Sequence, residues 1–169
     1  MITGKEFRER LAKLKPNVYM GGKLVDRFDP RLVGGINVMA STYDFAQDTE
    51  FEGVGVATSH LTGEKISRYC HIHQGMEDLL NKQKMTRLYS QEVGGCIQRC
   101  MGIDALNGVS IVSYEADQKY GTRYYQNFIQ FMKKVQQEDL SLNCAQTDVK
   151  GNRPWRPHQQ KDPDLYLRV

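Results

Sequence analysis

The segment of residues 97–114 constrains the fold of this chain most strongly, because apolar side chains recur along it with few polar interruptions. A helix that is apolar on most of its sides is normally buried among other elements. The sequence therefore predicts a central helix over residues 97–114, with other helices packed against it. Its apolar positions are Ile97, Met101, Ile103, Ala105, Leu106, Val109, Ile111 and Val112.

Two cysteines, Cys96 and Cys100, stand at the start of this segment. In a helix, side chains four residues apart share one face, with Cβ atoms roughly 5–6 Å apart, so two thiolates there can bind one metal centre. Three interpretations stay open. The pair can be core residues, because cysteine is often buried; part of a zinc site with Cys70 and His73; or half of an iron–sulfur centre completed by ligands from elsewhere.

Composition limits the classes of protein that this chain can belong to. At 169 residues it is long enough for one domain with a hydrophobic core. The 23 Lys and Arg residues barely outnumber the 20 Asp and Glu residues and are scattered, so we expect no nucleic-acid partner and no membrane contact. With four cysteines and no signal peptide or membrane-spanning run, we expect a cytoplasmic protein.

Amphipathic periodicity predicts four more helices. The first opens at a capping box formed by Thr3 and Glu6. The second begins at Asp29 and Pro30, the third spans residues 76–88, and the fourth follows Thr122 as its N-cap. Their apolar stripes include Phe7, Leu11 and Leu14; Leu32, Ile36 and Tyr43; Met76, Leu79, Leu80 and Leu88; and Tyr124, Phe128, Phe131, Met132 and Val135.

The other segments have the residues of turns, loops and short strands. We predict a hairpin over residues 17–25, a loop over 47–55, an irregular connector over 59–63, a short helix through Ile66, Tyr69, Cys70 and His73, and a loop over 147–157. Residues 162–169 alternate like a strand that has no partner. Because unpaired strands are a liability, we expect this chain to be the N-terminal portion of a longer protein.

Four stretches of the chain have a distinctive sequence, namely CIQRCMGIDA at 96–105, SYEADQKYGT at 113–122, QTDVKGNR at 146–153 and DPDLYLRV at 162–169. Together they resemble the 4-hydroxybutyryl-CoA dehydratases. The wider group includes vinylacetyl-CoA isomerase activity and the flavin-dependent 4-hydroxyphenylacetate 3-monooxygenases. Within it, the cysteine pair separates the dehydratases from the monooxygenases.

The resemblance implies a mainly α fold, namely the N-terminal helical domain of an acyl-CoA dehydrogenase-like protein with a small hairpin. Residues 1–142 would form this helical domain. Residues 143–169 would form a cofactor-lining loop and the first strand of a middle β domain. The full-length protein would be a homotetramer.

The resemblance also assigns roles to individual residues. Cys96 and Cys100 would bind a 4Fe–4S cluster, and Gln98 between them would face the substrate as a catalytic residue. The cluster's remaining His and Cys ligands would come from the C-terminal part. The residues that line the FAD site would be Gln146, Thr147, Asp148, Lys150, Gly151, Asn152 and Arg153. Val149 and Asn152 depart from the family motif, which usually has Pro and Asp at these places.

The implied activity is the FAD- and 4Fe–4S-dependent dehydration of 4-hydroxybutyryl-CoA to crotonyl-CoA by a radical mechanism, with associated vinylacetyl-CoA isomerisation. The isolated chain, with two of four cluster ligands, is expected to be inactive. One alternative is a flavin-dependent aromatic 3-monooxygenase of the 4-hydroxyphenylacetate type, in which the cysteines are core residues. Another is a non-enzymatic helical module with structural cysteines or zinc.

Overall fold

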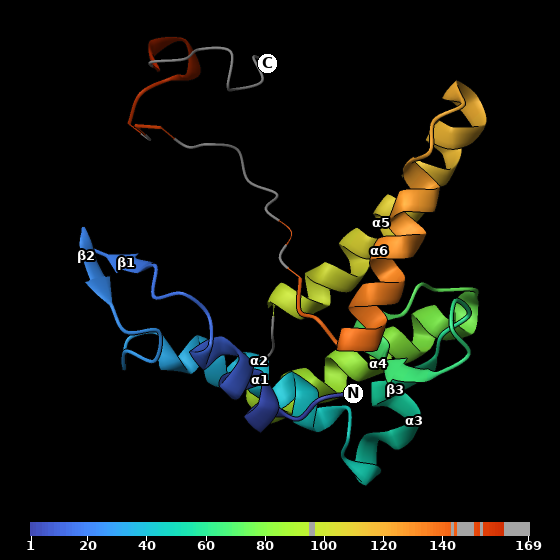
Figure 1. The fold of residues 1–169 in the computed structure, drawn as a ribbon, viewed down its shortest axis with the longest axis horizontal. Helices are drawn as coiled ribbons and strands as arrows, with labels where there is room; N and C mark the ends of the chain where they lie inside the picture. The colour runs from blue at the N-terminus through green and yellow to red at the C-terminus, as the bar shows by residue number, and fades with distance from the viewer. Residues whose placement is uncertain (95–96, 143, 145–150, 153, 161–169) are drawn as a thin grey trace.

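Six α-helices and two short antiparallel hairpins make up the part of the chain that the structure describes (Figure 1). The computed structural model describes residues 1–94, 97–142, 144, 151–152 and 154–160, and it describes residues 52, 97, 98 and 157 by their backbone alone. The mainly helical class predicted from the sequence is confirmed. The predicted strand over 162–169 lies outside the described residues.

The first two helices, α1 (Gly4–Ala12) and α2 (Val33–Phe45), pack against each other. The predicted capping box is present, because Thr3 Oγ1 accepts a hydrogen bond from the Glu6 amide and the Glu6 carboxylate accepts one from the Thr3 amide. Helix α2 begins at Val33 rather than at Asp29. The Asp29 carboxylate instead accepts hydrogen bonds from the backbone and side chain of Arg31, which makes a turn ahead of the helix.

The predicted hairpin is confirmed as β1 (Val18–Met20) paired with β2 (Lys23–Val25). Its turn residues Gly21 and Gly22 both have positive φ, a conformation that glycine adopts without strain. A second hairpin, β3 (Val56–Thr58) with β4 (Lys65–Ser67), was not predicted. The connector that was expected over 59–63 is the turn of this hairpin.

Two local predictions between α2 and α4 (Met76–Val93) are wrong. The polar segment 47–55 is not a loop throughout, since it contains the 3-10 turn η1 (Thr49–Phe51) and the short helix α3 (Glu52–Gly55). The short helix through 66–73 is reduced to one 3-10 turn, η2 (Arg68–Cys70), because Ile66 belongs to β4 and His71 is extended. Neither segment is long enough for periodicity to determine its structure.

Helices α4, α5 (Ile97–Tyr120) and α6 (Tyr124–Glu138) form the second half of the helical part. Helix α4 ends at Val93 and is capped by Gly94, whose left-handed backbone is typical of a helix C-terminus. The predicted N-cap of α6 is wrong. The carboxylate of Asp117, in α5, accepts hydrogen bonds from the backbone N–H groups of Tyr124 and Tyr125 and from the Thr122 hydroxyl.

Three buried clusters hold these elements together. The first joins α2, α3, η2 and α4 through Phe45, Val54, Tyr69, Met85 and Tyr89. The second joins η2, α5 and α6 through Cys70, Ile72, Leu106, Phe128, Met132 and Val135. The third joins α1 to α2 through Phe7, Ala40 and Tyr43.

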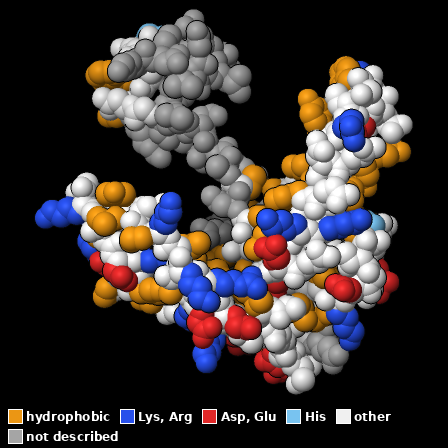
Figure 2. Space-filling view, viewed as in Figure 1, with side chains coloured by type: hydrophobic (Ala, Val, Ile, Leu, Met, Phe, Trp, Pro, Cys, Tyr) orange, Lys and Arg blue, Asp and Glu red, His pale blue; other side chains and the backbone are white. Residues whose placement is uncertain are grey.

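The prediction that α5 is buried on most sides holds only for its first half. Ile103 is fully buried, but further along Val109 and Val112 are 52% and 64% exposed. Here α5 and α6 run together as an arm that extends away from the other helices (Figure 1). Hydrophobic side chains lie at the tip and along the edges of this arm (Figure 2). No helix in the described part of the chain is both long and apolar enough to cross a membrane.

Candidate functional site

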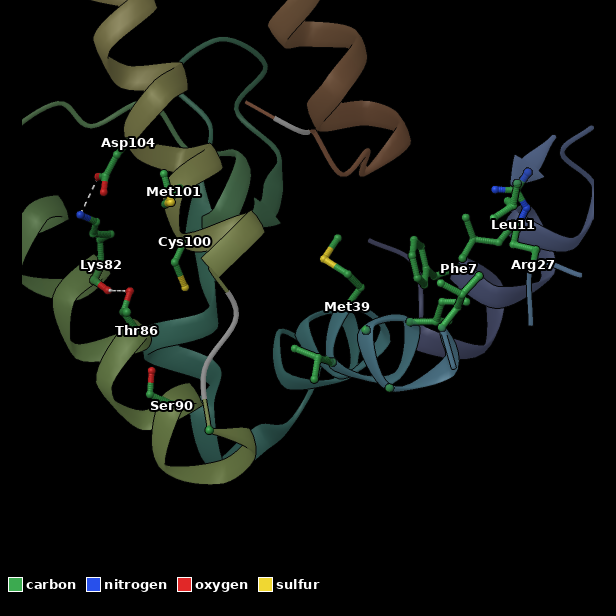
Figure 3. Close-up of a pocket in the computed structure, with 17 residues that line it drawn as sticks. Phe7, Leu11, Arg27, Met39, Lys82, Thr86, Ser90, Cys100, Met101 and Asp104 are labelled. Carbon is green, nitrogen blue, oxygen red and sulfur yellow. Dashed lines mark hydrogen bonds and ion pairs between the residues drawn. The ribbon is translucent and has the colours of Figure 1, made fainter. Parts of the chain in front are cut away.

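A pocket of about 880 Å³ lies between the α1–α2 pair and the α4–α5 pair (Figure 3). Its walls are mostly apolar, and pockets that are apolar with a few polar groups are the usual sites for ligands and cofactors. The lining residues are Phe7, Leu11, Val18, Arg27, Leu32, Gly34, Gly35, Ile36, Val38, Met39, Lys82, Thr86, Ser90, Gly94, Cys100, Met101 and Asp104.

Cys100 lies in the wall of this pocket, in the first turn of α5. Its side chain is half-buried and packs on the cluster that contains Tyr69, Met85 and Tyr89. Burial raises the pKa of the Tyr69 hydroxyl, and the neighbouring Cys100 raises it further. The thiol of Cys100 therefore stands between a dry core on one side and the pocket on the other.

The polar groups of the pocket come mainly from α4 and from the turn of α5 after Cys100. Lys82 Nζ lies 2.6 Å from Asp104 Oδ1, and this ion pair ties α4 to α5 (Figure 3). Thr86 donates a hydrogen bond to the Lys82 carbonyl oxygen at 3.0 Å, which is ordinary behaviour for a helical threonine. The Lys82 charge is thus already partnered at the edge of the pocket.

Most of the predicted site residues cannot be placed. Cys96, Gln146, Thr147, Asp148, Lys150 and Arg153 lie outside the described residues, as does the side chain of Gln98. Whether the two cysteines share one face of a helix therefore stays a prediction. Of the two predicted cluster ligands, only Cys100 is among the described residues, and it lies in the pocket wall.

The two described members of the predicted FAD-lining loop, Gly151 and Asn152, are not among the residues that line the pocket. Gly151 has a positive φ of 51°. The Asn152 amide donates to the Gln160 side chain at 2.9 Å, and Gln160 donates back to the Asn152 carbonyl oxygen at 2.7 Å. This segment ends in the 3-10 turn η3 (Pro157–Gln159), which Figure 1 shows apart from the helices.

The described residues give no support to a zinc site that uses Cys70 and His73. No three His, Cys, Asp or Glu side chains among them gather in a way that suits a metal ion. Cys70 is fully buried, and burial raises the pKa of its thiol to about 11, which disfavours the thiolate that metals bind. His73 keeps its Nε2 buried, and burial lowers its pKa.

The donor chemistry of Cys100 fits an iron–sulfur cluster, for which cysteine thiolate is the usual ligand. The pocket beside it has room for a cofactor or substrate, and most of its lining is apolar. Gly94 lines the same pocket, and a Cβ atom built there would meet no other atom within 4 Å. A bulky ligand can therefore approach the backbone at Gly94.

The comparisons with known proteins agree with this assignment of the fold. Residues 3–169 match the family described as 4-hydroxyphenylacetate 3-hydroxylase N terminal. The chain belongs to this family. The family resemblance seen in the sequence is thereby confirmed.

Among curated proteins, the chain is 42% identical over 171 residues to the 4-hydroxybutyryl-CoA dehydratase/vinylacetyl-CoA-Δ-isomerase of Clostridium aminobutyricum. That match covers 100% of this chain and 35% of the relative. The oxygenase component of 4-hydroxyphenylacetate 3-monooxygenase from Thermus thermophilus is 27% identical, and the match covers 99% of this chain and 34% of that protein. This chain spans about one third of the length of these family members, at the N-terminal end that the family describes.

Solved structures show the same relationship. An oxygen-tolerant archaeal 4-hydroxybutyryl-CoA dehydratase from N. maritimus superimposes with a TM-score of 0.85 at 40% identity, over 97% of this chain and 33% of that one. The oxygenase component of 4-hydroxyphenylacetate 3-monooxygenase, complexed with FAD and 4-hydroxyphenylacetate, superimposes with a TM-score of 0.70 at 24% identity. This match covers 96% of this chain and 34% of that one. The second likeness shows a shared fold alone.

Sequence reasoning missed one prominent side chain beside the pocket. Arg99 is buried and forms part of no predicted site. A signal for it exists in the sequence, since Arg99 shares the helical period of the apolar residues Ile103 and Leu106. A charged residue on a face that is otherwise apolar is worth singling out, because burying a charge is costly unless it is paired.

Proposed function

We propose that this chain is the N-terminal part of an FAD- and 4Fe–4S-dependent dehydratase that converts 4-hydroxybutyryl-CoA to crotonyl-CoA and isomerises vinylacetyl-CoA. The observation that carries the proposal is Cys100, a half-buried thiol in the wall of a large, mostly apolar pocket. The higher identity to the dehydratase relative, 42% against 27% for a monooxygenase component, supports the same choice.

In this proposal, the residues of the pocket each have a physical task. Cys100, together with Cys96, would hold one side of the cluster, and Gln98 between them would face the acyl-CoA. When bound, an iron–sulfur cluster and FAD supply Lewis-acid and redox chemistry. The apolar walls around Met39 and Met101 would keep water from the reacting carbons.

The remaining ligands and the remaining walls would come from a part of the protein that corresponds to the rest of its longer relatives. FAD would be lined by the loop that contains residues 146–153. A homotetramer of full-length subunits would be the active assembly, and the 169-residue chain alone would be inactive.

The test is anaerobic purification of the product of the complete natural reading frame. We expect a brown protein that contains iron, acid-labile sulfide and flavin and that forms crotonyl-CoA from 4-hydroxybutyryl-CoA. Cys100→Ser should lose iron and turnover. Cys144→Ser is the matched control, because Cys144 is also half-buried but is not among the residues that line the pocket, and it should retain iron.

Two other outcomes would overturn the proposal in distinguishable ways. An iron-free yellow protein that hydroxylates 4-hydroxyphenylacetate with a supplied reduced flavin would be a monooxygenase of the same fold. A protein that binds zinc and no flavin would be a non-enzymatic helical module. Equal iron content in Cys100→Ser and the unmodified protein would exclude Cys100 as a ligand.

A further inference from the structure

Arg99 is a buried cation directly before Cys100 in the first turn of α5. Only 3% of the residue is exposed. Burial of a charged side chain is unfavourable unless other groups pair with it and accept its hydrogen bonds. The surroundings of Arg99 therefore show what fixes this turn.

The guanidinium of Arg99 lies between two aromatic rings. Its central carbon is 4.2 Å from the ring centroid of Tyr43 and 4.7 Å from that of Tyr69, which are cation–π distances. Nη1 donates a hydrogen bond to Thr42 Oγ1 at 2.8 Å. Nη2 lies 3.4 Å from Asp139 Oδ1 and 3.9 Å from the sulfur of Cys70.

These partners come from three separate parts of the fold. Thr42 and Tyr43 belong to α2, Tyr69 and Cys70 to η2, and Asp139 directly follows α6. Asp139 is held in turn, since its Oδ2 accepts a hydrogen bond from the Ile2 amide at 3.0 Å. Burial opposes the charge on Arg99, but Cys70, Tyr43 and Asp139 favour it, and the pKa of Arg99 is raised above its usual value.

The geometry of a helix transmits this constraint to the neighbouring residue. Successive residues are about 100° apart around a helix axis, so fixing Arg99 fixes the direction of Cys100. Arg99, Gly102, Ile103 and Leu106 lie on the buried face of α5. Cys100, Met101 and Asp104 consequently line the pocket.

We infer that Arg99 is a positioning residue that sets the rotation of the first turn of α5 and thereby holds Cys100 in the pocket wall for its metal centre. The role of Cys100 as a metal ligand rests on the proposed function. The packing of Arg99 that fixes this turn of α5 does not depend on it. Lysine cannot replace Arg99 in this role, because an ammonium group lacks the planar fork that stacks on rings and donates in two directions.

The first measurement uses iron-free full-length protein and does not depend on the proposed function. The rate at which iodoacetamide alkylates Cys100 is measured by peptide mass spectrometry, under conditions where each variant is folded. In Arg99→Lys we expect alkylation roughly tenfold faster, because a loosened turn opens more often. In Asp139→Asn, which removes one charge partner and keeps the arginine, we expect a rise of about threefold.

Arg68→Lys is the matched control for a buried arginine. Arg68 is 5% exposed and donates to the carbonyl oxygens of Val54 and Val56, in α3 and β3, rather than to α2 or Asp139. Its replacement should lower stability, yet leave Cys100 alkylation within about twofold of the unmodified protein once folding is matched.

The second measurement uses the anaerobically purified holoprotein and reads the electron paramagnetic resonance spectrum of the reduced cluster. We expect Arg99→Lys to change the line shape and lower the iron content, and Arg68→Lys to change neither. If Asp139→Asn and every folded Arg99 variant alkylate at the unmodified rate, the inference is overturned. If the unmodified protein holds no iron, the proposed function fails, while the alkylation rates still decide the role of Arg99.

Discussion

At the scale of single residues, Gly4 gives a prediction whose sign opposes helix propensity. It begins α1, where alanine is normally the better residue. Here, however, a Cβ atom would meet the Asp44 carboxylate and lie 2.6 Å from the Ala40 carbonyl oxygen, because α1 packs tightly on α2. We expect Gly4→Ala to lower the free energy of unfolding by about 1–3 kcal/mol, the usual cost of overpacking.

Gly108 is the matched control for Gly4→Ala. It lies inside α5, and a Cβ atom there would meet nothing within 4 Å. Gly108→Ala should therefore raise the free energy of unfolding by up to about 1 kcal/mol, as helix propensity alone predicts. Urea unfolding of both variants measures the two effects. A stabilising Gly4→Ala would show that α1 does not approach α2 as closely as described.

Single residues also show why a sequence reveals some functional positions and hides others. Cys100 could be identified from a pair of rare residues at helical spacing, and it does line a pocket. The surroundings of Arg99 could not be identified from the sequence, because its partners are far away in the chain. Thr42, Tyr69 and Asp139 are 57, 30 and 40 positions from Arg99. Only tertiary packing brings these groups together.

At the scale of elements, the junction between α5 and α6 is expected to depend on pH through Asp117. Partial burial raises the pKa of this carboxyl, but hydrogen bonds from Thr122, Tyr124 and Tyr125 lower it, and the net shift is downward. A lowered pKa in the folded state stabilises the fold above the unfolded value of about 3.9, and this stabilisation is lost as pH falls through the folded value.

Asp117→Asn should therefore be less stable than the unmodified chain at pH 7, and the difference should shrink below about pH 4. Thermal unfolding followed by circular dichroism across this pH range measures it. Glu115→Gln is the control, because Glu115 is an exposed carboxylate of the same helix and makes none of these hydrogen bonds to α6. A difference between Asp117→Asn and the unmodified chain that persists unchanged at pH 3 would contradict the role of the charge.

The elements predicted correctly are those whose sequence signal is local and long. Helix α6 buries Phe128, Met132 and Val135 of its predicted stripe, and the β1–β2 hairpin has two glycines at its turn. Helix α4 is a helix as predicted, but Met76, Leu79 and Leu80 of its predicted apolar stripe are exposed. All four strands have only three residues, and the β3–β4 hairpin escaped prediction because its turn has one glycine, Gly63, where the β1–β2 turn has two. The burial of α5 was overestimated, since apolar composition does not say how many neighbours a helix has.

At the scale of the whole molecule, the described part of the chain consists of a helical body and an arm, with the pocket in the body. Several apolar side chains on the arm are exposed, among them Val109 at 52%, Val112 at 64% and Phe131 at 46%. Exposed apolar surface of this kind usually marks a contact with another part of a protein or with a partner. The relatives are about three times as long as this chain.

This arrangement leads to a prediction about activity. The purified 169-residue chain, kept under anaerobic conditions, should form no crotonyl-CoA from 4-hydroxybutyryl-CoA, because the proposed cluster needs more ligands than Cys96 and Cys100 supply. Far-ultraviolet circular dichroism establishes that the sample is helical, and the full-length protein assayed in parallel is the control. Turnover by the chain alone would refute the need for further ligands. Inactivity of a folded, iron-loaded full-length protein would instead count against the proposed reaction.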